Sequence, residues 1–298
     1  MQNFITRPAA TLLKRGCLCV LVLALAGCSL ARLGYSNGDT ITYWWLDGYV
    51  GFDSSQKPWV RQRIDKLFEW HRRTQLKEYV KLLTVAQKRL LHDVTKEEVL
   101  ADYEELTKCG DRIIDEMAPD MADLALSMDA DNLEHLRRKF DSNNEKYRKD
   151  YLHGDVQEKQ TYRFTVIMEW AEYWFGDFSD EQEAVIRRAS DQRPLNNEMW
   201  AADRIQRQQG LIALIKQIQL ERPPRAMVTE MIANYVRDNY LLRASATPEM
   251  KAFYDASKDG VARLTVIIVN ITTPKQKAHA TAKLKQWMDD FNTLADKT

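Results

Sequence analysis

Trp70, His71, Arg72 and Arg73 bring an aromatic ring, a titratable imidazole and two guanidinium groups together within four consecutive residues. Arginine side chains bind carboxylates and phosphates through two parallel hydrogen bonds. His71, Arg72 and Arg73 are therefore candidate contacts for an anion or for a carboxylate of a partner. The alternative, which we favour, is that Trp70 packs inward while both arginines face solvent and stabilise the C-terminal end of a helix.

The remainder of the sequence lacks the patterns of familiar catalytic and cofactor sites. It contains no glycine-rich phosphate loop, no Gly-x-Ser-x-Gly elbow and no His-Glu-x-x-His helix. The five histidines are scattered, and no two of them lie one helical turn apart. We therefore expect no catalytic site, no metal and no cofactor, and an enzyme without a recognisable motif is the alternative.

An aromatic block near the N-terminus contains Trp44, Trp45 and Tyr49, which are candidates for a membrane or partner surface. Trp and Tyr side chains prefer the headgroup zone of a bilayer, where one end of the ring meets apolar atoms and the other meets water. The alternative, which we favour, is one apolar face that docks on the rest of the protein, formed by Ile41, Trp44, Trp45, Tyr49 and Phe52.

Residues 1–27 have the pattern of a signal peptide: three basic residues, no acidic residue, and an apolar run too short to span a bilayer. The run ends in Leu25-Ala26-Gly27-Cys28, which resembles the lipobox of bacterial lipoproteins. This resemblance implies lipidation of the Cys28 sulfur, cleavage just before Cys28 and acylation of the new amine. An ordinary signal peptide with an incidental cysteine is the alternative.

Several acyl chains on Cys28 would give lasting membrane attachment, where a single chain would be reversible. In bacterial lipoproteins an Asp after the cysteine commonly retains the protein in the inner membrane, so Ser29 implies a periplasm-facing protein of the outer membrane. Cleavage leaves 271 residues with a net charge of −3, and no nucleic-acid partner is indicated. Cys109 is then the one free thiol, and it lies on an apolar helical stripe where a buried structural thiol is expected.

Apolar residues recur at helical spacing through most of the mature chain. Two of these stripes are Leu76, Tyr79, Val80 and Leu83, and Ile167, Trp170, Ala171 and Trp174. Such a stripe is stable only when it is buried against another helix. We therefore predict an all-α, irregular multi-helix bundle of about eight or nine helices over residues 39–298, after a tether at 28–38. The β-branched run 264–272 is predicted to be helical, since a lone strand would have no partner.

Helix starts are indicated by polar residues at N-cap and N3 spacing, which satisfy the free amides of a first turn. Five such pairs occur: Asp53 with Gln56, Thr95 with Glu98, Asp129 with Asn132, Ser179 with Gln182, and Thr273 with Gln276. Their spacing is irregular, which argues against a solenoid. Helix ends are predicted at Pro194, at 222–224 and before Pro248, and the double proline at 222–224 is a possible boundary between two sub-bundles.

Charge is balanced overall but is unevenly placed along the chain. Residues 54–92 hold ten basic and three acidic side chains, while residues 95–134 hold three basic and thirteen acidic ones. The expected explanation is a pair of neighbouring antiparallel helices with complementary faces. A basic patch on anionic lipid headgroups is the alternative.

Segments 43–50, 52–56, 69–76, 144–148 and 273–276 resemble an uncharacterised family of Gram-negative, all-helical outer-membrane lipoproteins with a domain of unknown function. The resemblance covers nearly the whole mature chain and implies a helical, membrane-anchored periplasmic protein. It implies no activity and no catalytic residue.

Residues 178–182 and 272–276 also resemble the Leu-Thr-x-x-Gln motif of small periplasmic stress chaperones, although both lack the leading Leu. The same residue types form a capping box in any helical protein, which is the interpretation that we favour. Taken together, the sequence predicts a lipid-anchored envelope protein that acts by binding, with a protein partner. A chaperone-like stress protein and an enzyme are the alternatives.

Overall fold

The computed structural model describes residues 30–240 and 247–297, and every regular element in those ranges is a helix. There are twelve: α2 Leu30–Ser36, α3 Gly38–Val50, α4 Gln56–Thr74, α5 Leu76–Arg89, α6 Lys96–Ser127, α7 Ala130–Tyr151, α8 Val156–Phe175, α9 Asp180–Asp191, α10 Asn197–Glu221, α11 Arg225–Tyr240, α12 Pro248–Asn270 and α13 Pro274–Ala295. The predicted all-α class is confirmed. The predicted number of eight or nine helices is too low.

The number was underestimated because several helix boundaries lack a local signal. α4 and α5 meet at Gln75, which keeps helical dihedrals (φ −95°, ψ −34°) with no Gly, Pro or capping box between the two helices. One start could have been recognised: Asp155 and Glu158 form a complete capping box at α8. Within the predicted tether 28–38, residues 30–36 form α2, and Arg32 of this helix pairs with the buried Asp290 of α13 (2.8 Å).

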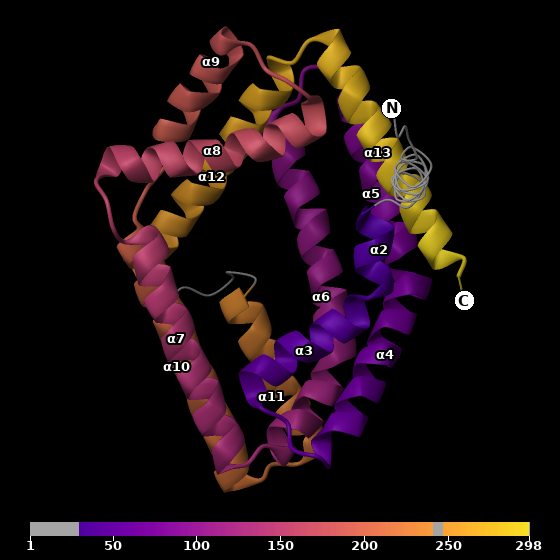
Figure 1. The fold of residues 1–298 in the computed structure, drawn as a ribbon, viewed down its shortest axis with the longest axis vertical. Helices are drawn as coiled ribbons and strands as arrows, with labels where there is room; N and C mark the ends of the chain where they lie inside the picture. Colours follow the sequence, from indigo (N-terminus) through magenta and orange to yellow (C-terminus); the bar gives the residue numbers. More distant parts are fainter. Residues whose placement is uncertain (1–29, 241–246, 298) are drawn as a thin grey trace, which may run out of the picture.

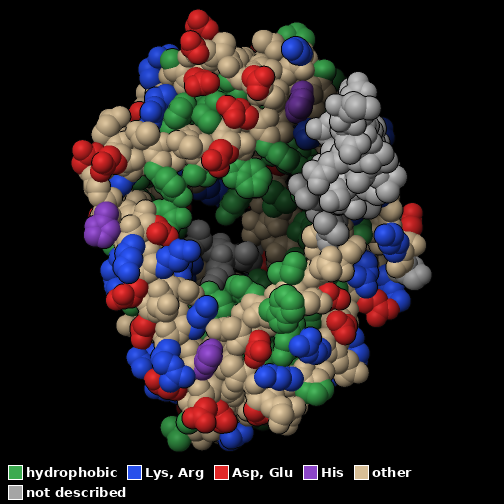
Figure 2. Space-filling view, viewed as in Figure 1, with side chains coloured by type: hydrophobic (Ala, Val, Ile, Leu, Met, Phe, Trp, Pro, Cys, Tyr) green, Lys and Arg blue, Asp and Glu red, His purple; other side chains and the backbone are tan. Residues whose placement is uncertain are grey.

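The helices form an elongated frame rather than a solid bundle (Figure 1). α7 packs along α10 on one side, α5 packs along α13 on the opposite side, and α8, α9 and α12 close one end. α6 runs between these parts and packs mainly on α11. Figure 2 shows that the molecule is hollowed at its centre, between α8 and α3.

The hydrophobic core is divided into clusters, as the frame requires. One cluster joins α3, α4, α7 and α10, a second joins α6, α10 and α11, and a third joins α8, α9 and α12. Two smaller clusters hold α13 against α5. Each helix therefore buries its stripe against close neighbours instead of against one common centre.

Four of the five predicted capping boxes are confirmed, at Thr95, Asp129, Ser179 and Thr273. Asp53 makes both bonds of a capping box, since its Oδ1 accepts from the Gln56 amide (2.9 Å) and its own amide donates to Gln56 Oε1 (3.2 Å). The helix itself begins only at Gln56.

The predicted helix ends also fit the structure. α10 ends at Glu221, and Arg222 then takes a left-handed conformation (φ 48°) before the double proline and the start of α11. Pro248 is the first residue of α12, and α12 continues through the β-branched run to Asn270. Pro119 was not anticipated as an interior helix residue, and it lies inside α6.

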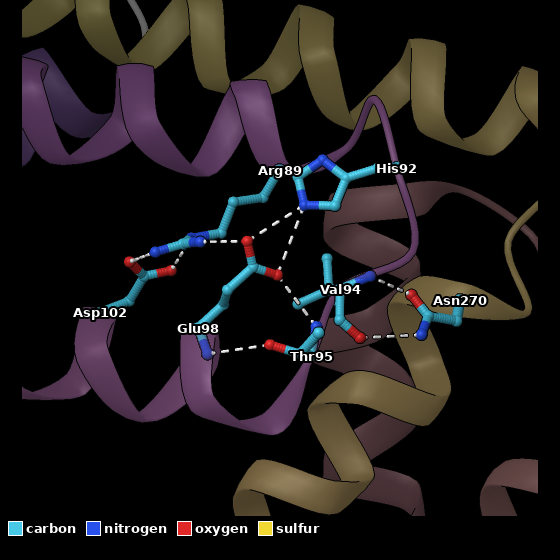
Figure 3. Close-up of polar contacts among 7 residues, drawn as sticks. All are labelled: Arg89, His92, Val94, Thr95, Glu98, Asp102 and Asn270. Atoms are coloured by element: carbon cyan, nitrogen blue, oxygen red, sulfur yellow. Dashed lines mark hydrogen bonds and ion pairs between the residues drawn. The ribbon is translucent and has the colours of Figure 1, made fainter.

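The charged segments pair across helices in part as expected. Arg89 of α5 binds Glu98 (2.7 Å) and Asp102 (2.8 Å) of α6, beside the capping box of Thr95 (Figure 3). Other α6 acids pair instead with α11, where Arg225 binds Asp123 and Arg237 binds Asp111 and Asp115. Acidic side chains of α6 thus pair with basic side chains of α5 and α11, and Asp120 pairs with Arg63 of α4.

Two capping boxes that lie far apart in the sequence dock on each other at the start of α4 and α7. Gln56 Nε2 donates to Asn132 Oδ1 (3.2 Å) and to the Ser127 carbonyl (3.2 Å). In return, Asn132 Nδ2 donates to the carbonyls of Gly51 (3.1 Å) and Val50 (3.2 Å). Each N3 side chain therefore caps its own helix and also holds the chain that enters the other helix.

We call such a pair of interlocked capping boxes a junction. A second junction lies at the starts of α9 and α13. Gln182 Nε2 donates to Gln276 Oε1 (3.0 Å) and to the Ile271 carbonyl (2.8 Å). Gln276 Nε2 donates to the Asp177 carbonyl (2.7 Å). In both junctions, each N3 side chain donates to a backbone carbonyl that lies two residues before the N-cap residue of the partner capping box. The chain therefore contains the same packing arrangement twice.

Candidate binding surface

α3 is amphipathic, and the junction of Gln56 with Asn132 fixes the point where this helix ends. Tyr43 and Val50 are buried in the core with Phe52, and Leu46 packs against them. Tyr43 stacks on Phe52 with ring centroids 6.2 Å apart, and Arg61 lies 3.6 Å from the centroid of the Tyr43 ring. These contacts determine which side of α3 faces solvent.

Trp44 and Trp45 lie on the solvent side, with 65% and 61% of their surface exposed, and Ile41 is 54% exposed. The expectation that these three side chains dock on the bundle is therefore wrong. The helix has two apolar stripes, and the core selects the one that contains Tyr43 and Val50. We call Trp44, Trp45 and Tyr49 the α3 surface.

Tyr49 connects this surface to α7. Its ring lies 4.8 Å from Trp45 and 6.0 Å from the buried Phe140, and its hydroxyl accepts a hydrogen bond from Asn143 Nδ2 (2.8 Å). Lys139 Nζ lies 5.6 Å from the same ring. The structure thus joins Trp45 to Tyr49 and adds Lys139 and Asn143, for which the sequence carried no signal, while Trp44 is a further exposed residue of the same helix.

His71 lies between two tyrosine hydroxyls rather than in an open anion site. Its Nδ1 is 2.7 Å from the Tyr35 hydroxyl and its Nε2 is 3.0 Å from that of Tyr79. A neutral imidazole satisfies both bonds, because one nitrogen donates and the other accepts. Burial, reinforced by the charge of Arg72, lowers the pKa of His71, and burial raises the pKa of Tyr35 to about 12.

The two neighbouring arginines do not lie with His71 as one clamp. Arg73 is exposed and pairs with Glu69, one helical turn earlier. Arg72 is half-buried, with its charge close enough to affect Tyr35 and His71. All three residues lie in the last turn of α4, as predicted. Their role as anion contacts stays a prediction.

Of the two cysteines of interest, only Cys109 lies within the described residues. It is a buried free thiol in α6, and Arg112 Nη2 donates to its sulfur (3.1 Å). Burial raises the pKa of this thiol, an effect that Arg112 opposes. Cys28 and the signal peptide pattern lie outside the described residues.

A cleft of about 320 Å³ lies between α4 and α6. Its walls are largely apolar, including Trp59, Leu67 and Met121, and Pro119 of α6 lines it. Arg63 lies 3.4 Å from Asp120 at this cleft, and burial raises the pKa of Asp120 while Arg63 opposes that rise. The cleft is large enough for a small ligand, but its acids and bases largely neutralise one another.

In comparisons with known proteins, the chain matches a family model. Residues 48–233, more than half of the chain, match a family of unknown function, DUF6279. The protein is a member of the DUF6279 family. No curated protein matches it, and no solved structure matches it. The matched region of this DUF6279 protein includes the first junction, Tyr49, His71 and Tyr79, whereas Tyr35 precedes it.

Among residues 30–240 and 247–297 of this DUF6279 protein, no group of three or more His, Cys, Asp or Glu side chains is placed to hold a metal ion. In the same ranges, no helix combines the length and apolar character of a membrane span.

Proposed function

We propose that this DUF6279 protein is a lipid-anchored, periplasm-facing protein of the outer membrane that binds a protein partner through the α3 surface. The observation that carries the proposal is the exposure of Trp44 and Trp45 on a helix whose other side is firmly packed. Burying one aromatic side chain of this size removes roughly 150–250 Å² from water, worth several kcal/mol. Trp and Tyr are also the residues that most often dominate the binding energy of protein interfaces.

The anchor rests on the N-terminal sequence pattern and on the position of α2. Only Ser29 separates Cys28 from the first residue of α2, which is held to the bundle by the ion pair of Arg32 with Asp290. A lipid on Cys28 would therefore keep the frame close to the membrane surface. Replacing Cys28 by Ser should release the protein from membranes, and continued membrane retention of C28S would refute lipidation.

The partner surface is tested by placing a photo-crosslinking amino acid at Trp44 or Trp45 in intact cells. We expect the same defined adduct from both positions and none from Leu220, an apolar residue that is 86% exposed on α10. Adducts of equal yield at all three positions, or none at Trp44 and Trp45, would contradict a specific surface on α3. Turnover of a substrate by the purified protein would overturn a purely binding role.

A chaperone-like role is the second candidate, and the same variants separate it from binding to one partner. A chaperone should suppress the aggregation of several unrelated unfolded proteins, and replacement of Trp44 and Trp45 should abolish that activity. The resemblance to the Leu-Thr-x-x-Gln motif gives this role little support, because Gln182 and Gln276 are engaged with each other and with backbone carbonyls. Gln56 and Asn132 form the same junction without the motif.

A further inference from the structure

We infer that the second half of the chain presents a second binding site equivalent to the α3 surface, on α8, and that one polypeptide partner occupies both. The α8 surface consists of Trp170 and Tyr173. This inference rests on the proposed function of the α3 surface and adds to it the location of a second site and the chemistry of the partner.

α3 and α8 end in similar ways, with their last glycines two and three residues before the N-cap residue of the first capping box of their junctions, although the ψ of that glycine differs (63° and −166°). Each ends at a glycine with positive φ, Gly51 (66°) and Gly176 (77°). The glycine amide donates to the carbonyl four residues earlier, that of Asp47 (2.7 Å) in α3 and that of Glu172 (2.8 Å) in α8. The two helices are therefore corresponding elements of two related halves.

α7 and α13 correspond in the same manner, because each begins at the second box of its junction. His135 and His279, each three residues after the N3 residue, both face the glycine that ends the preceding aromatic helix. Asn143 and Trp287 each lie eleven residues after the N3 residue of their helix. Asn143 donates to the Tyr49 hydroxyl (2.8 Å), and Trp287 Nε1 donates to the Tyr173 hydroxyl (2.8 Å).

The exposed tryptophans occupy matching positions in this repeat. Trp45 and Trp170 each lie six residues before their glycine, and they are 61% and 63% exposed. The sequence pattern had indicated a buried Trp170, which is wrong, because Ala171 and Met168 fill the core side of α8 instead. Trp170 packs edge-on to Tyr173, three residues later, with ring centroids 6.3 Å apart, whereas Trp45 packs on Tyr49, four residues later, with centroids 4.8 Å apart and the rings tilted by 48°. An exposed tryptophan retained at one position in both halves is not explained by packing.

A lysine accompanies each aromatic surface, and it lies seven residues after the N3 residue of α7 or of α13. Lys139 Nζ lies 5.6 Å from the Tyr49 ring, and Lys283 Nζ lies 5.0 Å from the Tyr173 ring. Neither ammonium group lies within ion-pair distance of a carboxylate in the described part of the chain. Each surface thus combines aromatic rings with an unneutralised cation.

This chemistry fits a polypeptide segment in which apolar side chains alternate with carboxylates. A bilayer rich in anionic lipids fits less well, because such membranes are typically bound by clusters of about four to eight basic residues, whereas one lysine lies at each surface, enough to pair with a single carboxylate of a polypeptide. Figure 2 shows hydrophobic side chains gathered over α8 on one side of the central hollow and over α3 on the other. One chain long enough to reach from α3 to α8 would contact both surfaces, and the second contact would form at a high effective concentration.

The test compares two fluorescein-labelled peptides on the full-length protein reconstituted in phosphatidylcholine vesicles. One peptide has a single Asp-Leu-Phe-Leu-Asp segment, and the other has two such segments joined by Gly-Ser linkers of increasing length. We expect the two-segment peptide to bind about 10²-fold to 10⁴-fold more tightly at the best linker length. W45S and W170S should each abolish that gain while changing single-segment binding only about twofold, as expected for the loss of one of two sites. The matched variant Leu220→Ser should behave as the wild type.

The outcomes separate the inference from the proposed function. If W45S abolishes binding and W170S has no effect, the α8 site is refuted and the α3 proposal stands. If neither substitution matters, or if no peptide binds, both are refuted. Tryptophan quenching by brominated phosphatidylglycerol that W170S removes would assign the α8 surface to the membrane and overturn the polypeptide partner.

Discussion

Asn132→Asp is the most informative substitution in the fold, because local and tertiary reasoning predict opposite signs for it. At the N3 position of α7, a carboxylate should stabilise the helix by about 0.3–1 kcal/mol through its favourable interaction with the helix dipole. The Asn132 amide, however, is buried and donates to the carbonyls of Gly51 (3.1 Å) and Val50 (3.2 Å). An ionised Asp has no proton to donate to either oxygen.

The magnitude follows from these contacts. Two lost hydrogen bonds cost about 1 kcal/mol each, and leaving the carbonyls unsatisfied beside a carboxylate adds about 1–3 kcal/mol. After the gain from the helix dipole is subtracted, N132D should lower the free energy of unfolding by about 2–5 kcal/mol at pH 7. Protonation restores one donor, so the pKa of the new carboxyl should be raised in the folded protein. Its stabilising, protonated form is then present at low pH and lost as the pH rises through that raised pKa, so the deficit should shrink as the pH falls from the raised pKa to about 4, the unfolded value, and stay at its smallest below that pH.

Urea unfolding followed by circular dichroism at 222 nm, at pH 7 and at pH 4, measures both effects. The control is Asn292→Asp on the exposed side of α13, which should change the free energy of unfolding by less than about 0.5 kcal/mol. An N132D variant as stable as the wild type at pH 7, or more stable, would show that the junction does not hold α3 in place.

Three further predictions concern single residues. Gly51→Ala should lower the free energy of unfolding by about 1–3 kcal/mol, because φ is +66° and the new Cβ would lie 2.9 Å from the His135 ring. Its control is Gly48→Ala, in open space within α3, which should raise the free energy of unfolding by about 0.5–1 kcal/mol in the same urea titration. Because the pKa of His71 is lowered in the folded protein, the free energy of unfolding of the wild type should fall as the pH drops below about 6.5, by at most about 1.4 kcal/mol per pH unit from this group. His71→Gln should flatten this part of the plot of unfolding free energy against pH. An unchanged plot would contradict a buried neutral imidazole. The Cys109 thiol should react with a thiol reagent at least about tenfold more slowly in the folded than in the urea-unfolded protein, and equal rates would contradict its burial.

The all-α class, four complete capping boxes and the helical state of residues 264–270, within the predicted run 264–272, were predictable from the sequence because they depend on local interactions. A capping box needs only two residues three positions apart, and a helical stripe repeats within one or two turns. The burial of Cys109 followed from the same periodicity. Helix boundaries without such a local feature, at Gln75 for example, were missed.

Only the tertiary structure decided which aromatic residues face solvent and which halves of the chain correspond. α3 offers two apolar stripes, and the core of α4 and α7 chose between them, so Tyr43 is buried and Trp45 is exposed. The junctions join Gln56 to Asn132 and Gln182 to Gln276, residues 76 and 94 positions apart. His71 likewise depends on hydroxyls supplied by α2 and α5. Contacts at such separations have no periodic signature, because they arise only when complete helices pack together.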